Sequence, residues 1–181
     1  QPGAPVRMSG TPWRLERPAP SLGQHNGEVF GGTRAAPEMQ RGRVPRTKGP
    51  QNRPLDGIRV LDFGWILSVP HCTQWLGSMG AEVLRVESNA HIEAGRTGDR
   101  AKTDGVVGVN RAGPWNGNNY SKLGLTLNLK EPEAIELVKE LAQKCDVVAE
   151  NFAPGVMDRL GLSYEAIRAV KSDIIYLSGT T

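Results

Sequence analysis

Two stretches of the chain have residue types that α/β enzymes use at the ends of their strands. Gly64–Val69 follows one apolar run, and Glu87 ends the next. In a dinucleotide-binding domain the first stretch holds G-x-G-x-x-G, whose glycines let the backbone approach a pyrophosphate. Here it has one glycine, and Trp65 and Ile66 would keep a pyrophosphate away. The pattern therefore argues against NAD(P) or FAD, and we expect Glu87 to pair with a neighbouring base.

The remaining reactive side chains form no complete catalytic or metal-binding set. His25, His71 and His91 share no spacing typical of metal ligands, so surface or capping roles are expected. Ser178 lies in Ser-Gly-Thr-Thr, which is not the G-x-S-x-G of a nucleophile elbow. There is no Walker A sequence. The residues alone thus predict a ligand-binding α/β unit with no metal site and no assigned catalytic residue.

The elements that would position these stretches begin with a strand-helix-strand unit. Ile58–Phe63 is a strand-length apolar run, Pro70–Met79 is helical, and Ala81–Val86 is a second strand. Gly80 is expected to end the helix in the left-handed conformation. Such a unit gives parallel strands, whose ligands bind at the carboxyl ends. We therefore expect the site at Gly64–Val69 and after Glu87.

The rest of the chain continues the α/β pattern after a long polar segment, Ser88–Asn119. Loops of this length are usually functional or mobile, and Trp115 is expected to anchor this one. The order of elements predicts an α/β fold, a Rossmann-like parallel sheet with flanking helices that is incomplete here. The further strands are expected at Gly124–Leu129, Cys145–Ala149 and Asp173–Leu177, and the helices at Glu131–Lys144, Pro154–Leu160 and Tyr164–Val170.

Residues 1–53 differ in composition from the rest. They hold nine Lys or Arg and three Glu, a net charge of +6. Residues 54–181 hold thirteen Lys or Arg and sixteen Asp or Glu, a net charge of −3. Eight prolines and eight glycines indicate an irregular extended arm. Thr11–Gly31 is the part able to pack as a strap, with a short helix at Gln24–Phe30. Without interleaved aromatic residues, the basic arm does not predict nucleic-acid binding.

Cysteine content and hydropathy bound the location of the protein. Cys72 and Cys145 lie far apart and match no metal spacing, so both are expected to be small buried residues in a reducing compartment. No run approaches the roughly 18 apolar residues of a membrane span. A cytoplasmic protein without a membrane segment is expected.

Four stretches together resemble the class III CoA-transferase (CaiB/BaiF) family. The family's PL-x-G-x-x-VLD corresponds to Pro54–Asp62, and its LGAxVIKVE to Met79–Glu87. Its NKRSLxLDLKxPEG is approximated by Ser121–Glu133, and ADVxVENFxPGVxDRLGLxYExL is nearly literal from Cys145 to Ile167. The order and spacing are those of the family over residues 54–167.

The arm has a family resemblance of its own. Residues 11–30, TPWRLERPAPSLGQHNGEVF, resemble the family's C-terminal tail, TPGRIRRPAPxLGEHxxEVL. A C-terminal family segment that precedes an N-terminal one implies two family domains fused in tandem, with circular permutation as the alternative. Residues 1–31 would be the tail of a preceding domain, 32–53 a linker, and 54–181 the N-terminal Rossmann-like part of the next. Family members are interlocked homodimers, which a fusion would replace by a pseudo-dimer.

The resemblance implies exchange of CoA between an acyl-CoA and a carboxylic acid. In the family an aspartate attacks the acyl-CoA and passes through an aspartyl-CoA thioester, which is covalent catalysis. By the family pattern this nucleophile lies beyond Thr181, so the chain alone is expected to be an inactive fragment. Asp62, Asp146 and Asp158 belong to structural motifs and are not assigned to catalysis.

The resemblance also places CoA, the substrate carrier, with no tightly bound cofactor. The first loop would lie beside the thiol arm, the turn after the third strand beside the adenosine, and Arg159 against phosphate, which suits arginine's planar fork. The implied contacts are Leu67, Ser68, Leu127, Asn128, Leu129, Lys130, Asn151, Phe152, Ala153 and Arg159.

The sequence departs from the family pattern at three places. The family often has Gln or Ala before Gly-Pro where Leu67–Pro70 stands, a base where Ser88 stands, and NKRS where Tyr120–Leu123 stands. These changes leave the acyl substrate open. An acyl-CoA racemase or isomerase on the same scaffold, or a non-catalytic CoA-binding module, therefore stays an alternative.

Overall fold

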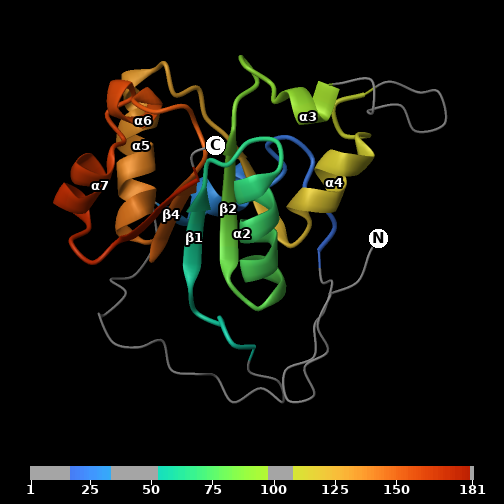
Figure 1. Cartoon of the computed structure of the whole chain (residues 1–181), viewed down its shortest axis with the longest axis horizontal. Helices are drawn as coiled ribbons and strands as arrows, with labels where there is room; N and C mark the ends of the chain where they lie inside the picture. The colour runs from blue at the N-terminus through green and yellow to red at the C-terminus, as the bar shows by residue number, and fades with distance from the viewer. Residues whose placement is uncertain (1–16, 34–52, 98–107, 180–181) are drawn as a thin grey trace.

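Five short apolar segments pair side by side in a parallel sheet. Their bounds are β1, Arg59–Asp62; β2, Glu82–Glu87; β3, Lys122–Thr126; β4, Val147–Glu150; and β5, Ile175–Ser178. The strand order is β3-β2-β1-β4-β5, and every neighbouring pair is parallel. The computed structural model describes residues 17–33, 53–97 and 108–179. The predicted α/β fold with a Rossmann-like parallel sheet is confirmed (Figure 1).

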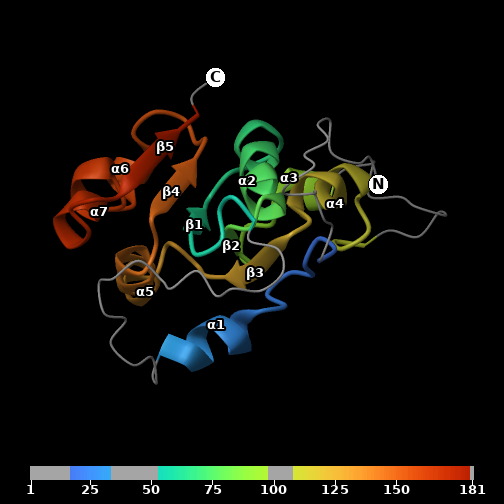
Figure 2. The same ribbon diagram turned by 90° about the horizontal axis from the view of Figure 1, so that it is seen from below.

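Helices cover both faces of the sheet, as parallel strands require. Their bounds are α1, Asn26–Thr33; α2, Ser68–Ser78; α3, Ala94–Thr97; α4, Gly113–Asn119; α5, Pro132–Gln143; α6, Val156–Arg159; and α7, Tyr164–Val170. Figure 2 shows α2 and α4 on one side of the sheet and α1, α5, α6 and α7 on the other. Because side chains of a strand alternate, Val60 and Leu61 of β1 enter the two different cores.

The helix expected at Pro70–Met79 begins two residues earlier, at Ser68. Pro70 therefore lies third in α2, still in the first turn, where its missing N–H breaks no intrahelical hydrogen bond. Gly80 follows the helix with φ of +113°, and its N–H closes the last turn. The predicted stop at Gly80 is confirmed, whereas Ser68 and Val69 belong to the helix and not to the predicted loop Gly64–Val69.

Two further boundaries differ from the prediction for physical reasons. The third strand was expected at Gly124–Leu129 but is Lys122–Thr126, because the buried Lys122 extends it at its start. The segment Ser88–Asn119 contains α3 and α4 where it is described. Its anchor is Trp115, 2% exposed, as predicted. Residues 98–107 of this segment lie outside the described ranges.

The expectation that both cysteines are buried is wrong for Cys72. It lies on the outer side of α2, exposed, whereas Cys145 is buried. Burial raises the pKa of the Cys145 thiol to about 12. Both thiols are unpaired.

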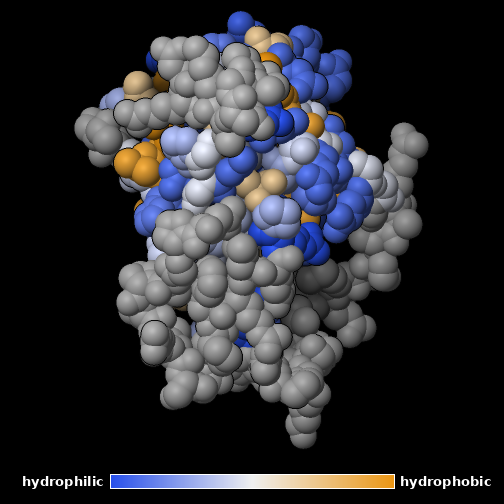
Figure 3. Space-filling view, turned by 90° about the vertical axis from the view of Figure 1, so that its right-hand side faces the viewer, coloured by the Kyte–Doolittle hydropathy of each residue, from blue (hydrophilic) through white to orange (hydrophobic). Residues whose placement is uncertain are grey.

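The surface over α3 and α4 is largely hydrophilic where it is described, with a few scattered hydrophobic residues (Figure 3). Scattered apolar residues are normal on a folded surface. Across the placed ranges no helix combines the length and the apolar character that crossing a membrane needs.

Residues 17–25, here called the strap, pack along the outer edge of β3. The Gly124 N–H donates to Nδ1 of His25 (2.9 Å), and the His25 N–H donates back to the Gly124 carbonyl (3.0 Å). The Thr126 N–H donates to Oδ1 of Asn26 (2.8 Å), whose amide donates to the Thr126 hydroxyl (2.6 Å). Side chains thus satisfy amides that an edge strand leaves unpaired.

The strap confirms the expected packing for the part that is described. The short helix expected at Gln24–Phe30 is α1, which begins at Asn26 and ends at Thr33, inside the predicted linker. Residues 1–16 and 34–52, which hold the rest of the predicted tail and linker, lie outside the described ranges.

The hydrogen bond at His25 predicts that strap docking depends on pH. Burial lowers the pKa of His25 below 6.5, Glu28 opposes this and Arg17 adds to it. The folded pKa is below the unfolded one, so the stabilisation is present above pH 6.5 and is lost as the pH falls through the folded pKa. We expect hydrogen exchange at the Gly124 amide, corrected for its intrinsic pH dependence, to lose protection below about pH 6.5.

His25→Gln supplies the matched control for this experiment. Its amide oxygen accepts a hydrogen bond at every pH, so protection of Gly124 should become independent of pH over the same range. An equal loss of protection in this variant would show that another group controls the strap.

Candidate active site at the carboxyl edge of the sheet

The strand order reverses between β1 and β4, and two loops meet there. In open α/β sheets this switch point is where ligands bind. Asn151, directly after β4, joins the loop after β1: its Oδ1 accepts from the Trp65 N–H (2.6 Å), and its Nδ2 donates to the Trp65 carbonyl (2.9 Å) and the Ser68 hydroxyl (3.2 Å). Ser68 and Asn151, expected as ligand contacts, are therefore brought together.

An aromatic cluster lies over the same junction. The rings of Trp65 and His91 stack with centroids 5.2 Å apart and an interplanar angle of 24°. Phe152 meets Trp65 edge to face at 5.8 Å. Loops following β1, β2 and β4 thus contribute one ring each, and Phe152 is the predicted contact among them.

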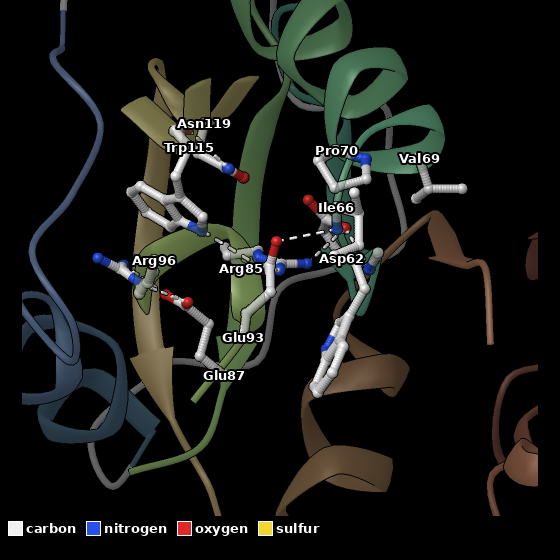
Figure 4. Close-up of polar contacts among 12 residues, drawn as sticks. Asp62, Ile66, Val69, Pro70, Arg85, Glu87, Glu93, Arg96, Trp115 and Asn119 are labelled. Atoms are coloured by element: carbon white, nitrogen blue, oxygen red, sulfur yellow. Dashed lines mark hydrogen bonds and ion pairs between the residues drawn. The ribbon is translucent and has the colours of Figure 1, made fainter. Parts of the chain in front are cut away.

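The first loop has a strained backbone at Ile66. Its φ is +64°, which is a genuine outlier for a β-branched residue. The Ile66 N–H donates to Oε1 of Glu93 (2.9 Å), which holds the loop in this conformation (Figure 4). The side chains of Ile66 and Leu67 are 54% and 59% exposed. Strain of this kind persists where the surroundings enforce it, and it clusters at functional sites.

Beneath the loop, Asp62 at the end of β1 is fully buried and ionised. Lys122 Nζ donates to its Oδ2 (2.9 Å), as does the Thr73 hydroxyl (2.7 Å), while the Gly64 N–H donates to Oδ1 (2.7 Å). Lys122 completes its three hydrogen bonds with the Pro70 carbonyl (2.8 Å) and with Asn119 Oδ1 (2.9 Å). The aspartate is structural, as expected.

Arg85 of β2 extends these contacts into a buried charge network. Its guanidinium forms a short ion pair with Glu93 and a longer one, 3.5 Å, with Asp62. Figure 4 shows Arg85 between the two carboxylates. The network therefore runs from Lys122 through Asp62 and Arg85 to Glu93, and from there to the Ile66 backbone.

The pKa values of Asp62 and Lys122 keep both groups charged. Burial alone would raise the pKa of Asp62, but the positive charges of Lys122 and Arg85 and the Thr73 hydrogen bond hold it below its ordinary value. Burial lowers the pKa of Lys122 to about 8, although Asp62 opposes this. Near pH 7 both groups are ionised, and their charges compensate each other.

A second buried ion pair follows β2. Arg96 binds Glu87 through two hydrogen bonds of 2.7 Å, which confirms the expected pairing of Glu87 with a base. The Arg96 guanidinium also lies 3.3 Å from the ring centroid of Trp115 and donates to the Pro20 carbonyl of the strap (3.2 Å). Glu87 is thus committed to the protein and is not a ribose ligand.

Sequence reasoning missed Glu93, Arg85 and Lys122. The available signal was a charged residue inside a strand that must be covered on both faces, since such a residue needs a buried partner. Arg85 meets that condition, but the sequence does not say which acid it pairs with. Lys122 lies before the strand predicted at Gly124–Leu129, so it gave no such signal. Glu93 lies in a polar segment and gave no signal.

A family model, CoA-transferase family III, matches residues 55–181. The chain belongs to CoA-transferase family III. Formyl-CoA:oxalate CoA-transferase of Bradyrhizobium sp. (strain ORS 278) is 38% identical over 126 residues, 68% of this chain and 28% of that protein. Succinyl-CoA:glutarate CoA-transferase of Mus musculus is 36% identical over 137 residues, which are 75% of this chain and 30% of that protein.

Solved structures agree with this membership. A CaiB/BaiF family protein from Brucella suis superposes with a TM-score of 0.63 at 35% identity, covering 71% of this chain and 33% of that one. A hypothetical protein from Mycobacterium tuberculosis superposes with a TM-score of 0.63 at 35% identity, covering 72% of this chain and 34% of that one. The expected family resemblance is confirmed. The chain spans about 30% of the length of the curated relatives it matches.

The remaining predicted contacts of this family III chain lie along the same edge of the sheet. Leu127 is 9% exposed and packs in the core, so its side chain faces away from solvent, while Asn128 bonds Glu131. Lys130, Ala153 and Arg159 are exposed. The turn after β3 lies two strands from β1, so Leu127–Lys130 and the first loop lie at separate places on the edge.

We expect Glu93→Gln to destabilise this family III chain strongly. The change leaves Arg85 buried with a weakened counter-charge, which costs about 3 kcal/mol. Urea unfolding monitored by circular dichroism measures this loss. Glu82→Gln is the control, because Glu82 pairs with Arg59 at the surface and its loss should cost at most about 1 kcal/mol. Equal losses in the two variants would contradict a central role for Glu93.

Proposed function

We propose that this chain is part of a CoA-transferase that moves CoA between an acyl-CoA and a carboxylic acid. The observation that supports it most is the match to CoA-transferase family III over residues 55–181. The junction of the β1 and β4 loops through Asn151 supports a ligand site at the switch point of that domain. Acyl-CoA and carboxylic acid are the substrates, and no tightly bound cofactor is required.

The chemical step proposed is attack of an aspartate on the acyl-CoA carbonyl. The acyl group leaves CoA thiolate to form an anhydride, and the thiolate then attacks the aspartyl carbonyl, giving an aspartyl-CoA thioester and releasing the acid. Asp62, Glu87 and Glu93 are each buried and ion-paired, so none is available for this role. The nucleophile is therefore a different carboxylate of the protein.

CoA would lie along the carboxyl edge of the sheet. Its thiol arm passes the loop with Leu67 and Ser68 and the segment Asn151–Ala153. Its phosphates meet Arg159, which is exposed on α6, and its adenosine lies near Asn128–Lys130. Arginine suits phosphate because its planar fork donates two parallel hydrogen bonds.

The tandem arrangement is part of the same proposal. Residues 1–31 are proposed as the tail of a preceding family domain and 32–53 as a linker, with a pseudo-dimer in place of the interlocked homodimer. The strap supports this, because residues 17–25 dock on the edge of β3 and His25 bonds the Gly124 backbone there. Two unpaired cysteines support a cytoplasmic protein.

The test uses the protein expressed from its complete reading frame. It is incubated with short acyl-CoA donors and carboxylate acceptors, and new CoA thioesters are separated by chromatography. Transfer together with loss of activity in hydroxylamine, which converts an aspartyl thioester to a hydroxamate, is the expected result. Exchange of the α-proton in D2O without CoA transfer would establish the racemase instead. Tight CoA binding with neither reaction would establish a binding module.

We further expect Arg159→Gln to weaken CoA binding about tenfold. The variant loses a charged hydrogen bond to phosphate, which is worth about 1.5–3 kcal/mol. Isothermal titration with CoA measures the change in Kd. The control is Arg168→Gln on α7, an exposed arginine over the Tyr164 ring at 5.8 Å, which should leave Kd unchanged. Unchanged binding in both variants would remove Arg159 from the site.

A further inference from the structure

We propose that the loop after β1 selects an acyl group with a hydrocarbon chain, so that the acid handled here is a monocarboxylic acid. This inference rests on the proposed function, because the CoA thiol arm places the acyl group beside this loop. It concerns residues 64–67, here called the first loop. The inference rests on the hydrogen-bond donors and side chains of the first loop that remain free to contact a ligand.

Every backbone N–H of the first loop is already used by the protein. Gly64 donates to Asp62 Oδ1 (2.7 Å), Trp65 to Asn151 Oδ1 (2.6 Å) and Ile66 to Glu93 Oε1 (2.9 Å). Leu67 donates to the Trp65 carbonyl (2.9 Å). A carboxylate at the far end of an acyl chain needs donors, and this backbone has none to give.

The charges beneath the first loop are equally committed. Asp62 and Arg85 are 0% exposed and Glu93 is 3% exposed, and Arg85 pairs with both carboxylates. A ligand above the loop therefore meets no free cation from below. An anionic end of an acyl group would lose its hydration there without a compensating partner.

What the first loop does present is apolar. Ile66 and Leu67 are the large hydrophobic residues most exposed at this edge, at 54% and 59%. The positive φ of Ile66, held by Glu93, keeps its side chain away from the core (Figure 4). Covering this surface with hydrocarbon removes apolar area from water, which is favourable in proportion to the area.

This surface differs in kind from what dicarboxylic acids need. Two relatives are named for oxalate and for succinyl and glutarate, all of which have a second carboxylate. The backbone of the first loop offers that group no free N–H, and the loop has no charged side chain. The acyl substrate is therefore expected to end in a methyl group and not in a carboxylate.

The experiment compares acyl-CoA esters of matched length on the protein expressed from its complete reading frame. Isothermal titration gives Kd for CoA, acetyl-CoA, butyryl-CoA, hexanoyl-CoA and succinyl-CoA. Butyryl-CoA and succinyl-CoA have four-carbon acyl groups and differ only at the end. We expect butyryl-CoA to bind at least tenfold more tightly than succinyl-CoA. From acetyl to hexanoyl, Kd should fall about two- to fourfold per methylene.

Variants locate the effect at the first loop. Leu67→Gln keeps the side chain's size but makes it polar, and Ile66→Asn suits a positive φ and keeps the N–H to Glu93. Both should reduce the gain per methylene more than they reduce affinity for free CoA. Val170→Gln, at an exposed apolar residue on α7, is the matched control and should retain the whole series.

The outcomes separate this inference from the proposed function. If free CoA binds but succinyl-CoA binds as well as butyryl-CoA, the inference is wrong and the function stands. If affinity is independent of chain length, Ile66 and Leu67 are covered by another part of the protein or contact only the thiol arm, and the inference is again wrong. If free CoA does not bind, the proposed function fails and this inference fails with it.

Discussion

The ionised side chain of Asp62 is the interaction on which the rest of the structure depends. A carboxylate that is 0% exposed is tolerable only when its charge and lone pairs are satisfied, and four different parts of the chain do this. Lys122 comes from β3, Arg85 from β2, Thr73 from α2, and the Gly64 N–H from the loop that follows. Any shift in register would strand a buried charge, which fixes the relative positions of three strands and a helix.

The same network connects the core to the carboxyl edge of the sheet. Arg85 transmits the requirement for a counter-charge from Asp62 to Glu93, and Glu93 holds the Ile66 backbone in a conformation that it would not adopt alone. The neighbouring pair of Glu87 and Arg96 holds the strap in a similar way, because Arg96, bound to Glu87, also donates to the Pro20 carbonyl of the strap. Buried electrostatics, more than apolar packing, therefore sets the geometry of the exposed loops.

The sequence predicts the sheet and its helices because their signals are local. Apolar runs of strand length, the amphipathic α5 and the stop at Gly80 require knowledge of neighbouring residues only. The network could not be predicted, because the acids that pair with Arg85 and Lys122 lie 8 to 60 positions away and pairing depends on the strand order. The start of β3 was predicted at Gly124 and lies at Lys122, because the sequence does not show that Lys122 has a buried acidic partner. Among the predicted ligand contacts, Ser68 and Asn151 lie together because β1 and β4 are neighbours in the sheet. The sequence shows this only if the strand order is known.

The backbone and the side chains of the first loop have separate roles. The amides of residues 64–67 are bound to Asp62, Asn151, Glu93 and the loop itself, so their positions cannot change without disturbing the core. The side chains of Ile66 and Leu67 point to solvent and take no part in that network. Substitutions there alter what a ligand meets while the backbone stays in place. If the first loop selects the acyl group as proposed, this selectivity can vary at little cost in stability, because Ile66 and Leu67 are exposed side chains on a loop whose backbone is held by buried charges.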